Sequence, residues 1–353
     1  MTSPTVRLGA PTGHLRVGSR FTLLLHARSL AVVAVTLLVA LAGAAASLTT
    51  GTYPVCLAEM VEVLRGRGEG LAPFIVLQQR LPRVVGALLI GGLLGVSGAL
   101  FQSVSRNPLG SPDIVGFLRG ATTGGLLMIL ALGSTSTLTT GAGAILGGAV
   151  TAVIVVVLTL RRGVGGDVLV LTGIALGQML ASLNDYLLAA TSIESAEAAK
   201  TWQHGSLNGI GWQSVAPLLL IAAVLLPVGL WIAGPGRILE LGDDSAAGLG
   251  LRVRRTRATM IGYAVVLAAV CVATCGPIGF LALAAPQLAR RMCRSAGMSL
   301  LPSFMVGATV LLLADFVAGR LLSPFQIPVG LVSSALGGLY LLWLLGFTGG
   351  RRN

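Results

Sequence analysis

The chain has 353 residues, of which 54% are hydrophobic and only 10% are charged. A soluble domain usually carries about 25% charged residues, so this composition excludes an ordinary soluble enzyme or binding module. The formal net charge of +12 could suggest a nucleic-acid partner, but the arginines lie in short loops between apolar runs. That placement is typical of membrane proteins, which carry excess positive charge in their cytoplasmic loops, and we expect no nucleic-acid partner.

The apolar runs, taken in chain order, predict about ten transmembrane helices. Most approach the ~20 residues needed to cross hydrocarbon, where backbone polar groups must be paired internally. The predicted spans are Leu30–Leu48, Val84–Val104, Ile114–Leu132, Gly141–Leu160, Val168–Ala190, Val215–Ile232, Ala258–Cys275, Ile278–Leu288, Leu301–Val317 and Val329–Phe347. The predicted fold class is therefore an all-α polytopic membrane protein.

Two of these runs need comment. The first follows four arginines and ends in small residues, AGAAAS, a pattern shared with cleaved signal peptides. Its length is sufficient to cross a membrane, so we expect it to be retained as the first helix. The eighth is short and is flanked or cut by Pro277 and Pro286, which is typical of a broken helix that lines a cavity or packs against other protein.

The distribution of basic residues predicts the orientation. With the N-terminus inside and all ten runs crossing, 17 of the 24 basic residues lie on the cytoplasmic side and six outside, with Arg119 inside a span. If the eighth run did not cross, the division would be 13 to 10. Ten spans with both termini cytoplasmic therefore fit the rule best. We expect a cytoplasmic segment at 1–29, a transmembrane domain at 30–347 in the cell (inner) membrane, an inner loop at about 233–257 and a cytoplasmic tail at 348–353.

Nucleotide and metal chemistry is missing from the sequence. A phosphate-binding loop G-x-x-x-x-G-K-[ST] needs glycines before its lysine, and the single lysine, Lys200, lies in AAKTW. Cys271 and Cys275 share a helix face but have no histidine or carboxylate nearby in sequence. We therefore expect no ATPase site, no metal site and no cofactor in this chain.

Ionisable residues in the spans are few, namely Arg119, Asp185 and Asp315. Such residues are functional candidates by default. Each also lies near a predicted helix end, where capping or snorkelling would explain it, and both interpretations stay open.

Three stretches carry specific motifs. They are RLPRVVGALLIGGLLGVSGALFQSVSRNPLGSPDIVG at 80–116, ELGDDSAAGLGLRV at 240–253, and CGPIGFLALAAPQLARR at 275–291 followed by LLLADFVAGRLLSPFQIPVGLVSSALGG at 311–338. Together, and in this order, they resemble the permease subunits of iron-siderophore and vitamin B12 ABC importers, the FecCD type. The stretches at 171–189 and 201–212 are most similar to ferric-enterobactin permeases. The resemblance covers about residues 30 to 347 and implies the type II ABC importer permease fold.

Three arginines lie on the predicted outer side, where basic residues are otherwise scarce: Arg80, Arg83 and Arg320. Contact with lipid headgroups is one interpretation. The resemblance implies another, in which outer arginines at these positions receive acidic side chains of a substrate-binding protein. The planar guanidinium fork suits that task because it pairs carboxylates bidentately.

The second motif places acidic residues on a basic inner face. An aspartate at 243 or 244 can cap a short helix that a following glycine ends, and a plain surface loop is the alternative. The resemblance implies that this loop couples the permease to its ATPase subunit. The coupling candidates are Glu240, Leu241, Gly242, Asp243, Asp244, Ala247, Gly248 and Gly250.

Small residues in the spans are candidates for close helix packing or for the transport pathway, which the resemblance places at the dimer axis along the fifth and tenth spans. These candidates are Gly91, Gly95, Gly98, Gly173, Gly177, Gly276 and Pro277. The first three lie on nearly one helix face, which favours packing. The sequence departs from the family pattern at Gln287, where histidine is frequent, and at Arg119, where a small or polar residue is common. These departures leave the substrate detail open.

We expect the transmembrane permease subunit of an ABC importer that moves an iron-siderophore complex inward by alternating access at a permease dimer interface. The resemblance implies four partners: an ABC ATPase dimer, an extracytoplasmic siderophore-binding protein, a second permease subunit (a paralogue) and membrane lipid. A vitamin B12 or haem permease is the alternative within the family, and an ion-coupled secondary transporter or a membrane enzyme the alternatives outside it. The sequence shows no cluster of catalytic residues, so we expect no enzyme.

Overall fold

The computed structural model describes residues 14–17, 21–24, 27–113, 116–133, 136–162, 166–295, 297–322 and 325–348. Its helices are α1 (Ala27–Thr49), α2 (Leu57–Leu64), the π-helix η1 (Phe74–Arg80), α3 (Leu81–Ser105), α4 (Phe117–Leu132), α5 (Thr137–Arg162), α6 (Gly166–Ala189), α7 (Ile193–Gln203), α8 (Trp212–Leu239), α9 (Asp243–Gly248), α10 (Val253–Cys275), α11 (Leu281–Cys293), α12 (Leu300–Ala318) and α13 (Val329–Thr348). Two short strands, β1 (His14–Val17) and β2 (Phe21–Leu24), pair antiparallel ahead of α1. The ten predicted spans correspond to α1, α3, α4, α5, α6, α8, α10, α11, α12 and α13, so the predicted fold class is confirmed.

Within the described residues, five segments are long and apolar enough to cross a membrane by length and composition alone: α1, η1–α3, α8, α10 and α12. Many of their large apolar side chains face outward, such as Leu38 (66% exposed), Leu220 (72%) and Trp231 (68%). Such surfaces are unfavourable in water, but they suit hydrocarbon surroundings. The long helices therefore expose apolar faces where a soluble protein would place charge.

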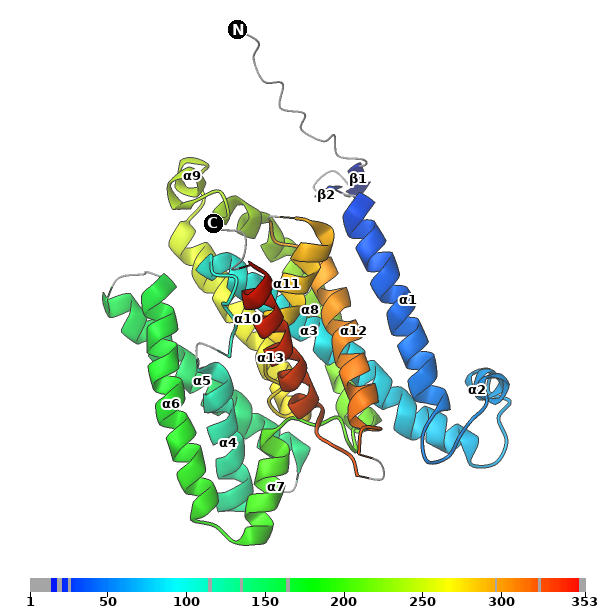
Figure 1. Ribbon diagram of the computed structural model, residues 1–353. Helices are drawn as coiled ribbons and strands as arrows, with labels where there is room; N and C mark the ends of the chain where they lie inside the picture. The colour runs from blue at the N-terminus through cyan, green and yellow to red at the C-terminus, as the bar shows by residue number, and fades with distance from the viewer. Residues whose placement is uncertain are drawn as a thin grey trace.

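Helix α3 is the centre of the bundle. Nearly all of its residues from Ile90 to Val104 are buried, and it packs against α12, α10 and α11 (Figure 1). Helix α1 lies at one edge, where it packs mainly on α12, and α4, α5 and α6 form a group on the other side. Glycines on α3 allow its close neighbours to approach, as small residues do in membrane helix packing.

The bundle has two distinct ends. The start of α1, the end of α13 and the short helix α9 lie at one end, and α2 and α7 lie at the other (Figure 1). We call these the α9 end and the α7 end. The Nε of Arg28 at the start of α1 donates to the carbonyl of Met292 near the end of α11, at 2.9 Å. Helix α11 therefore returns the chain to the α9 end, as ten crossings require.

Two predicted spans have wrong boundaries. The eighth span was placed at Ile278–Leu288, whereas α11 begins at Leu281 and ends at Cys293. The preceding connection contains two residues with positive φ, Gly276 at 76° and Phe280 at 64°. A positive φ at a bulky residue such as Phe280 cannot be predicted from the sequence. The sixth span was ended at Ile232, but α8 continues to Leu239 despite its internal prolines, so much of the predicted inner loop is helical.

Candidate functional site

The three predicted docking arginines come together at the α7 end, where α1 and α12 end and α3 begins. Arg320 lies close enough to Arg80 and Arg83 for their charges to interact. Each arginine is partly buried, and each is held by acceptors within the chain. The structure thus gathers the three side chains that the sequence singled out, and it also gives each of them a structural partner.

Arg80 fixes the chain that follows α1. Its Nη1 donates to the carbonyl of Leu48 at 2.7 Å, and its Nη2 to the carbonyl of Tyr53 at 2.5 Å. The last carbonyls of a helix have no intrahelical partner, and a cation near them also suits the negative end of the helix dipole. Arg80 therefore caps α1 and anchors the chain beyond it.

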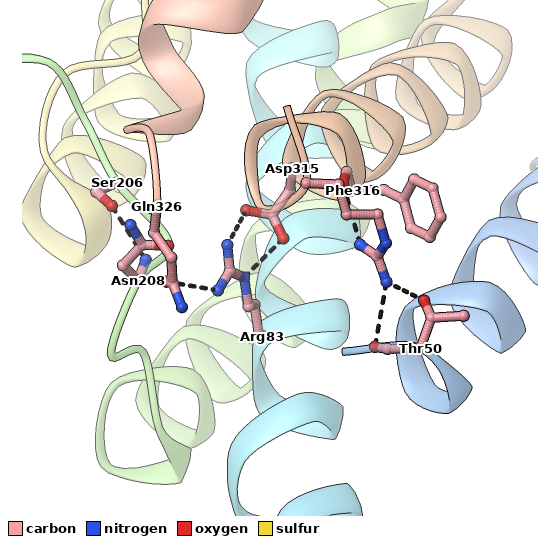
Figure 2. Close-up of polar contacts among 8 residues, drawn as sticks. Thr50, Arg83, Ser206, Asn208, Asp315, Phe316 and Gln326 are labelled. Atoms are coloured by element: carbon pink, nitrogen blue, oxygen red, sulfur yellow. Dashed lines mark hydrogen bonds and ion pairs between the residues drawn. The ribbon is translucent and has the colours of Figure 1, made fainter. Parts of the chain in front are cut away.

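Arg83 forms a two-point ion pair with Asp315 of α12 (Figure 2). Nε lies 2.8 Å from Oδ2 and Nη2 lies 3.0 Å from Oδ1. The Asp315 side chain is 8% exposed and that of Arg83 is 23% exposed. Gln326, in the α12–α13 connection, faces the other side of the guanidinium, with Oε1 3.4 Å from Nη1. The pair joins the start of α3 to the end of α12.

This pairing leaves part of the Arg83 fork available. A guanidinium has five N–H donors, and Asp315 uses one on Nε and one on Nη2. Among the described residues, the edge formed by Nη1 and the second N–H of Nη2 has only the long contact to Gln326. An incoming carboxylate can therefore pair end-on while Asp315 stays in place.

Arg320 completes the cluster from the end of α12. Its Nη1 donates to the carbonyl of Phe316 at 3.0 Å, and its guanidinium carbon lies 3.6 Å from the centre of the Phe316 ring. Its Nη2 donates to both oxygens of Thr50, with 3.1 Å to the carbonyl. The bonds to Thr50 tie Arg320 to the residue that directly follows α1.

At the α9 end, Glu240 is a structural anchor. Its Oε1 accepts from the hydroxyl of Ser103 in α3 at 3.0 Å, and its Oε2 accepts from the backbone N–H of Met298 at 3.1 Å. These bonds tie the end of α8 to α3 and to the connection before α12. Glu240 was predicted to couple the ATPase, and the geometry favours a role in holding the inner segments together.

Asp243 plays a similar part at the first residue of α9. Nη2 of Arg257 donates to its two oxygens at 3.0 and 3.1 Å, and Arg106 also pairs with it. Arg106 follows α3, so α9 is held against two long helices.

The remaining coupling candidates form an outward surface. Leu241, at the start of α9, is 64% exposed, and Leu249 at its end, which the sequence analysis did not single out, is 66% exposed. Asp244, Ala247, Gly248 and Gly250 are also exposed, and only Ala246 faces inward. Gly242 precedes the helix at φ 111°, a conformation that glycine adopts without strain. We call this exposed set the α9 surface.

The glycines of α3 lie directly against neighbouring backbones. A Cβ added at Gly91 would lie 2.4 Å from the carbonyl of Gly307, and one at Gly98 would lie 1.6 Å from the carbonyl of Ala282. A Cβ added at Gly95 would likewise clash with the carbonyl of Ser303. This geometry favours helix packing over a pathway role for the three glycines.

The other small candidates differ. In α6, a Cβ at Gly177 would meet its nearest atom at 3.7 Å, and Gly173 approaches Gly116 through its carbonyl. Gly276 lies against the backbone of Trp202, near the end of α7, and of Gly205. Gly173 and Gly177 thus lie between α6 and the start of α4, and the 276–280 connection packs on the residues after α7.

A cavity of about 490 Å³ gathers several charged residues that the sequence could not place together. Arg119 of α4, Asp185 of α6 and Lys200 of α7 line it, with Asp113 and His204. The 276–280 connection, Leu283 and the start of α13 complete its wall. We call it the central cavity. The sequence analysis did not identify Asp113, Lys200 and His204 as site residues. The charged lining comes from four separate elements, so no single stretch of sequence shows that these residues lie together.

His204 lies outside the membrane-spanning helices, in the connection after α7. Burial and the nearby charge of Lys200 lower the pKa of His204 from its ordinary value. At neutral pH it is therefore an uncharged hydrogen-bonding group at the rim of the central cavity.

Gln287, the other departure noted above, is buried and does not line the central cavity. Its Nε2 donates to the carbonyl of Pro108, so it joins α11 to the connection after α3.

Comparison with known proteins agrees with this architecture. The model of the FecCD transport family matches residues 28–346. The ferric enterobactin transport system permease protein FepG of Escherichia coli (strain K12) is 42% identical over 84% of this chain and 90% of its own length. The Fe(3+)-citrate import system permease protein YfmE of Bacillus subtilis (strain 168) is 36% identical over 78% of this chain and 82% of its own length.

A solved structure has the same fold. An inward-facing metal-chelate type ABC transporter matches with a TM-score of 0.77 and 28% identity, over 90% of this chain and 99% of its own. The family predicted from the three motifs is confirmed: the chain belongs to the FecCD transport family.

Proposed function

We propose that this chain is the permease subunit of an ABC importer for iron-siderophore complexes. The observation that carries the proposal is the family match over residues 28–346, together with relatives named for ferric enterobactin and ferric citrate transport. The ATPase is a separate subunit in this family, so the chain supplies the membrane path and not the energy.

The α9 surface is the proposed contact for the ATPase. Leu241 and Leu249 expose apolar area at both ends of a short helix, and Asp244 adds one exposed charge. A compact helix that is already anchored through Asp243 can transmit force without first becoming ordered. The α9 end is then cytoplasmic, which agrees with the arginines at 252–257 beside it.

The arginine cluster at the α7 end is the proposed contact for a siderophore-binding protein. The free edge of Arg83 is the best-placed group, because the donors of Arg80 and Arg320 are largely used within the chain. We propose that a carboxylate of the binding protein pairs end-on with Arg83.

A second permease subunit is proposed to cover the apolar faces of α6 and α13. Leu171, Met179 and Tyr186 of α6 are at least 63% exposed, and Leu339 and Leu342 of α13 at least 64%. The central cavity has both helices in its wall. A partner over these faces would enclose the cavity, and we expect that partner to be a paralogue.

Uptake of metal-labelled substrates in a strain that lacks this chain tests the function, with iron as the label for the chelates and haem and cobalt for vitamin B12. Ferric enterobactin, ferric citrate, ferrichrome, haem and vitamin B12 are supplied separately, with and without the chain restored. Restored uptake of one or more ferric siderophores supports the proposal. Restoration of haem or vitamin B12 uptake alone would assign the chain to the alternative substrate class.

A further inference from the structure

The central cavity combines features that favour an anion. Arg119, Lys200 and Asp185 are all exposed in it. Among the described residues, none of these three takes part in an ion pair. Charged groups are rare in membrane-embedded protein and mark transport sites there. Arg119 and Asp185 lie on the spanning helices α4 and α6, and Lys200 joins them from the short helix α7. All three charges are therefore available to a passing solute.

The fourth charge is partly neutralised by the protein itself. Asp113 is partly buried. It accepts a hydrogen bond from the backbone of Phe280 and lies near enough to Arg119 for their charges to interact. The lining therefore carries two positive and two negative side chains, and of the three that are exposed, two are positive and one, Asp185, is negative.

The ends of several helices add partial positive charge to the cavity. Helices α4, α11 and α13 all begin at the cavity, through Arg119, Phe280 and Gly330. The first N–H groups of a helix carry partial positive charge, and discontinuous transporter helices aim such ends at anionic substrates. Two helices end there, α7 through Gln203 and α10 two residues before Pro277, so the starting helices outnumber the ending ones.

We propose that the central cavity is an anion-selective contact on the pathway, in which Arg119 and Lys200 recognise negatively charged ferric chelates. This inference rests on the proposed function and adds the substrate charge to it. A ferric tris-catecholate carries three negative charges, and a ferric trihydroxamate carries none. The volume of about 490 Å³ contributed by one subunit lies within the usual range of ligand pockets, roughly 300–1,000 Å³.

The inference predicts opposite effects for opposite charges. Arg119→Gln and Lys200→Gln each weaken binding of the anionic chelate about tenfold, because each removes an attraction in a site of low dielectric. Asp185→Asn removes a repulsion and strengthens binding severalfold. Arg119→Lys keeps the charge and retains most of the affinity.

The test is equilibrium binding of iron-labelled ferric enterobactin and of ferrichrome to the assembled importer in nanodiscs, without its binding protein. Arg237→Gln serves as the matched control, because Arg237 is an exposed arginine near the end of α8 and does not line the cavity. We expect the cavity variants to alter enterobactin binding in the stated directions and to leave ferrichrome binding within about twofold. Thermal unfolding of each variant checks that the complex is intact.

Equal effects on both chelates, or no effect of Arg119→Gln and Lys200→Gln, would overturn the anion-selective contact. An Asp185→Asn change in the same direction as Arg119→Gln would also overturn it. If the wild-type chain restores no siderophore uptake in cells, the proposed function itself fails. The two failures are thus distinguishable.

Discussion

The Arg83–Asp315 pair supports a quantitative prediction about its two roles. Arg83→Gln removes both charged bonds to Asp315, at 2.8 and 3.0 Å, and leaves a carboxylate that is only 8% exposed. Breaking a buried ion pair by removing one partner costs about 3–5 kcal/mol. Because Arg83 is 23% exposed, we expect a loss near the lower limit, about 3 kcal/mol.

A double variant separates stability from docking. Arg83→Gln with Asp315→Asn removes the unpaired charge, and Asn keeps the shape of Asp315, so most of the lost stability should return. Docking should stay weak in both variants, because neither presents a guanidinium to the binding protein. Thermal unfolding of the purified complex measures the first quantity, and equilibrium binding of the binding protein measures the second.

Two results would refute this reasoning. If Arg83→Gln leaves the unfolding temperature unchanged, the pair does not hold α3 to α12. If the double variant regains docking along with stability, the carboxylate of the binding protein does not use Arg83. Arg65→Gln, which removes an exposed arginine directly after α2, is the control for a general loss of outer positive charge.

Other residues give independent tests. Gly98→Ala should destabilise the complex by about 2 kcal/mol, since overpacking of this kind costs about 1–3 kcal/mol, whereas Gly177→Ala should be tolerated; thermal unfolding compares them. Leu241→Asp and Leu249→Asp should abolish co-purification of the ATPase while membrane insertion stays normal, and retained ATPase would remove the coupling role of the α9 surface. The lowered pKa of His204 means that the native state resists protonation there. Its contribution to stability is therefore full above its ordinary pKa of 6.5 and falls as the pH drops below that value. His204→Gln should flatten the pH dependence of thermal unfolding, and an unchanged slope would contradict the assignment.

The arrangement of spans was readable because hydrophobic length is a local property. The ten apolar runs marked their helices even where a proline intervened. The exact ends of the helices were harder to predict from the sequence. Helix α8 continues past Pro227 and Pro235, residues that would end most helices in water. Helix α11 starts late because Phe280 adopts a left-handed conformation that only its tertiary surroundings explain.

The sites were predicted only where one segment carried them. The α9 surface lies within a single stretch, and most of its exposed residues were coupling candidates, whereas exposed Leu249 was not singled out from the sequence. The partner of Arg83 lies 232 positions away, so the sequence offered Asp315 as an isolated charge without a partner. The central cavity draws Asp113, Arg119 and Asp185 from separate elements, and no periodicity links them.

The central claim is that this chain is one half of a membrane channel driven by a separate ATPase. Its most direct test is uptake of iron-labelled ferric enterobactin into proteoliposomes that contain the complete importer, with the loaded binding protein outside and ATP inside. We predict uptake that requires ATP and that is lost when Leu241→Asp and Leu249→Asp are combined. Uptake that continues without ATP, or that survives loss of the ATPase from the complex, would contradict the account.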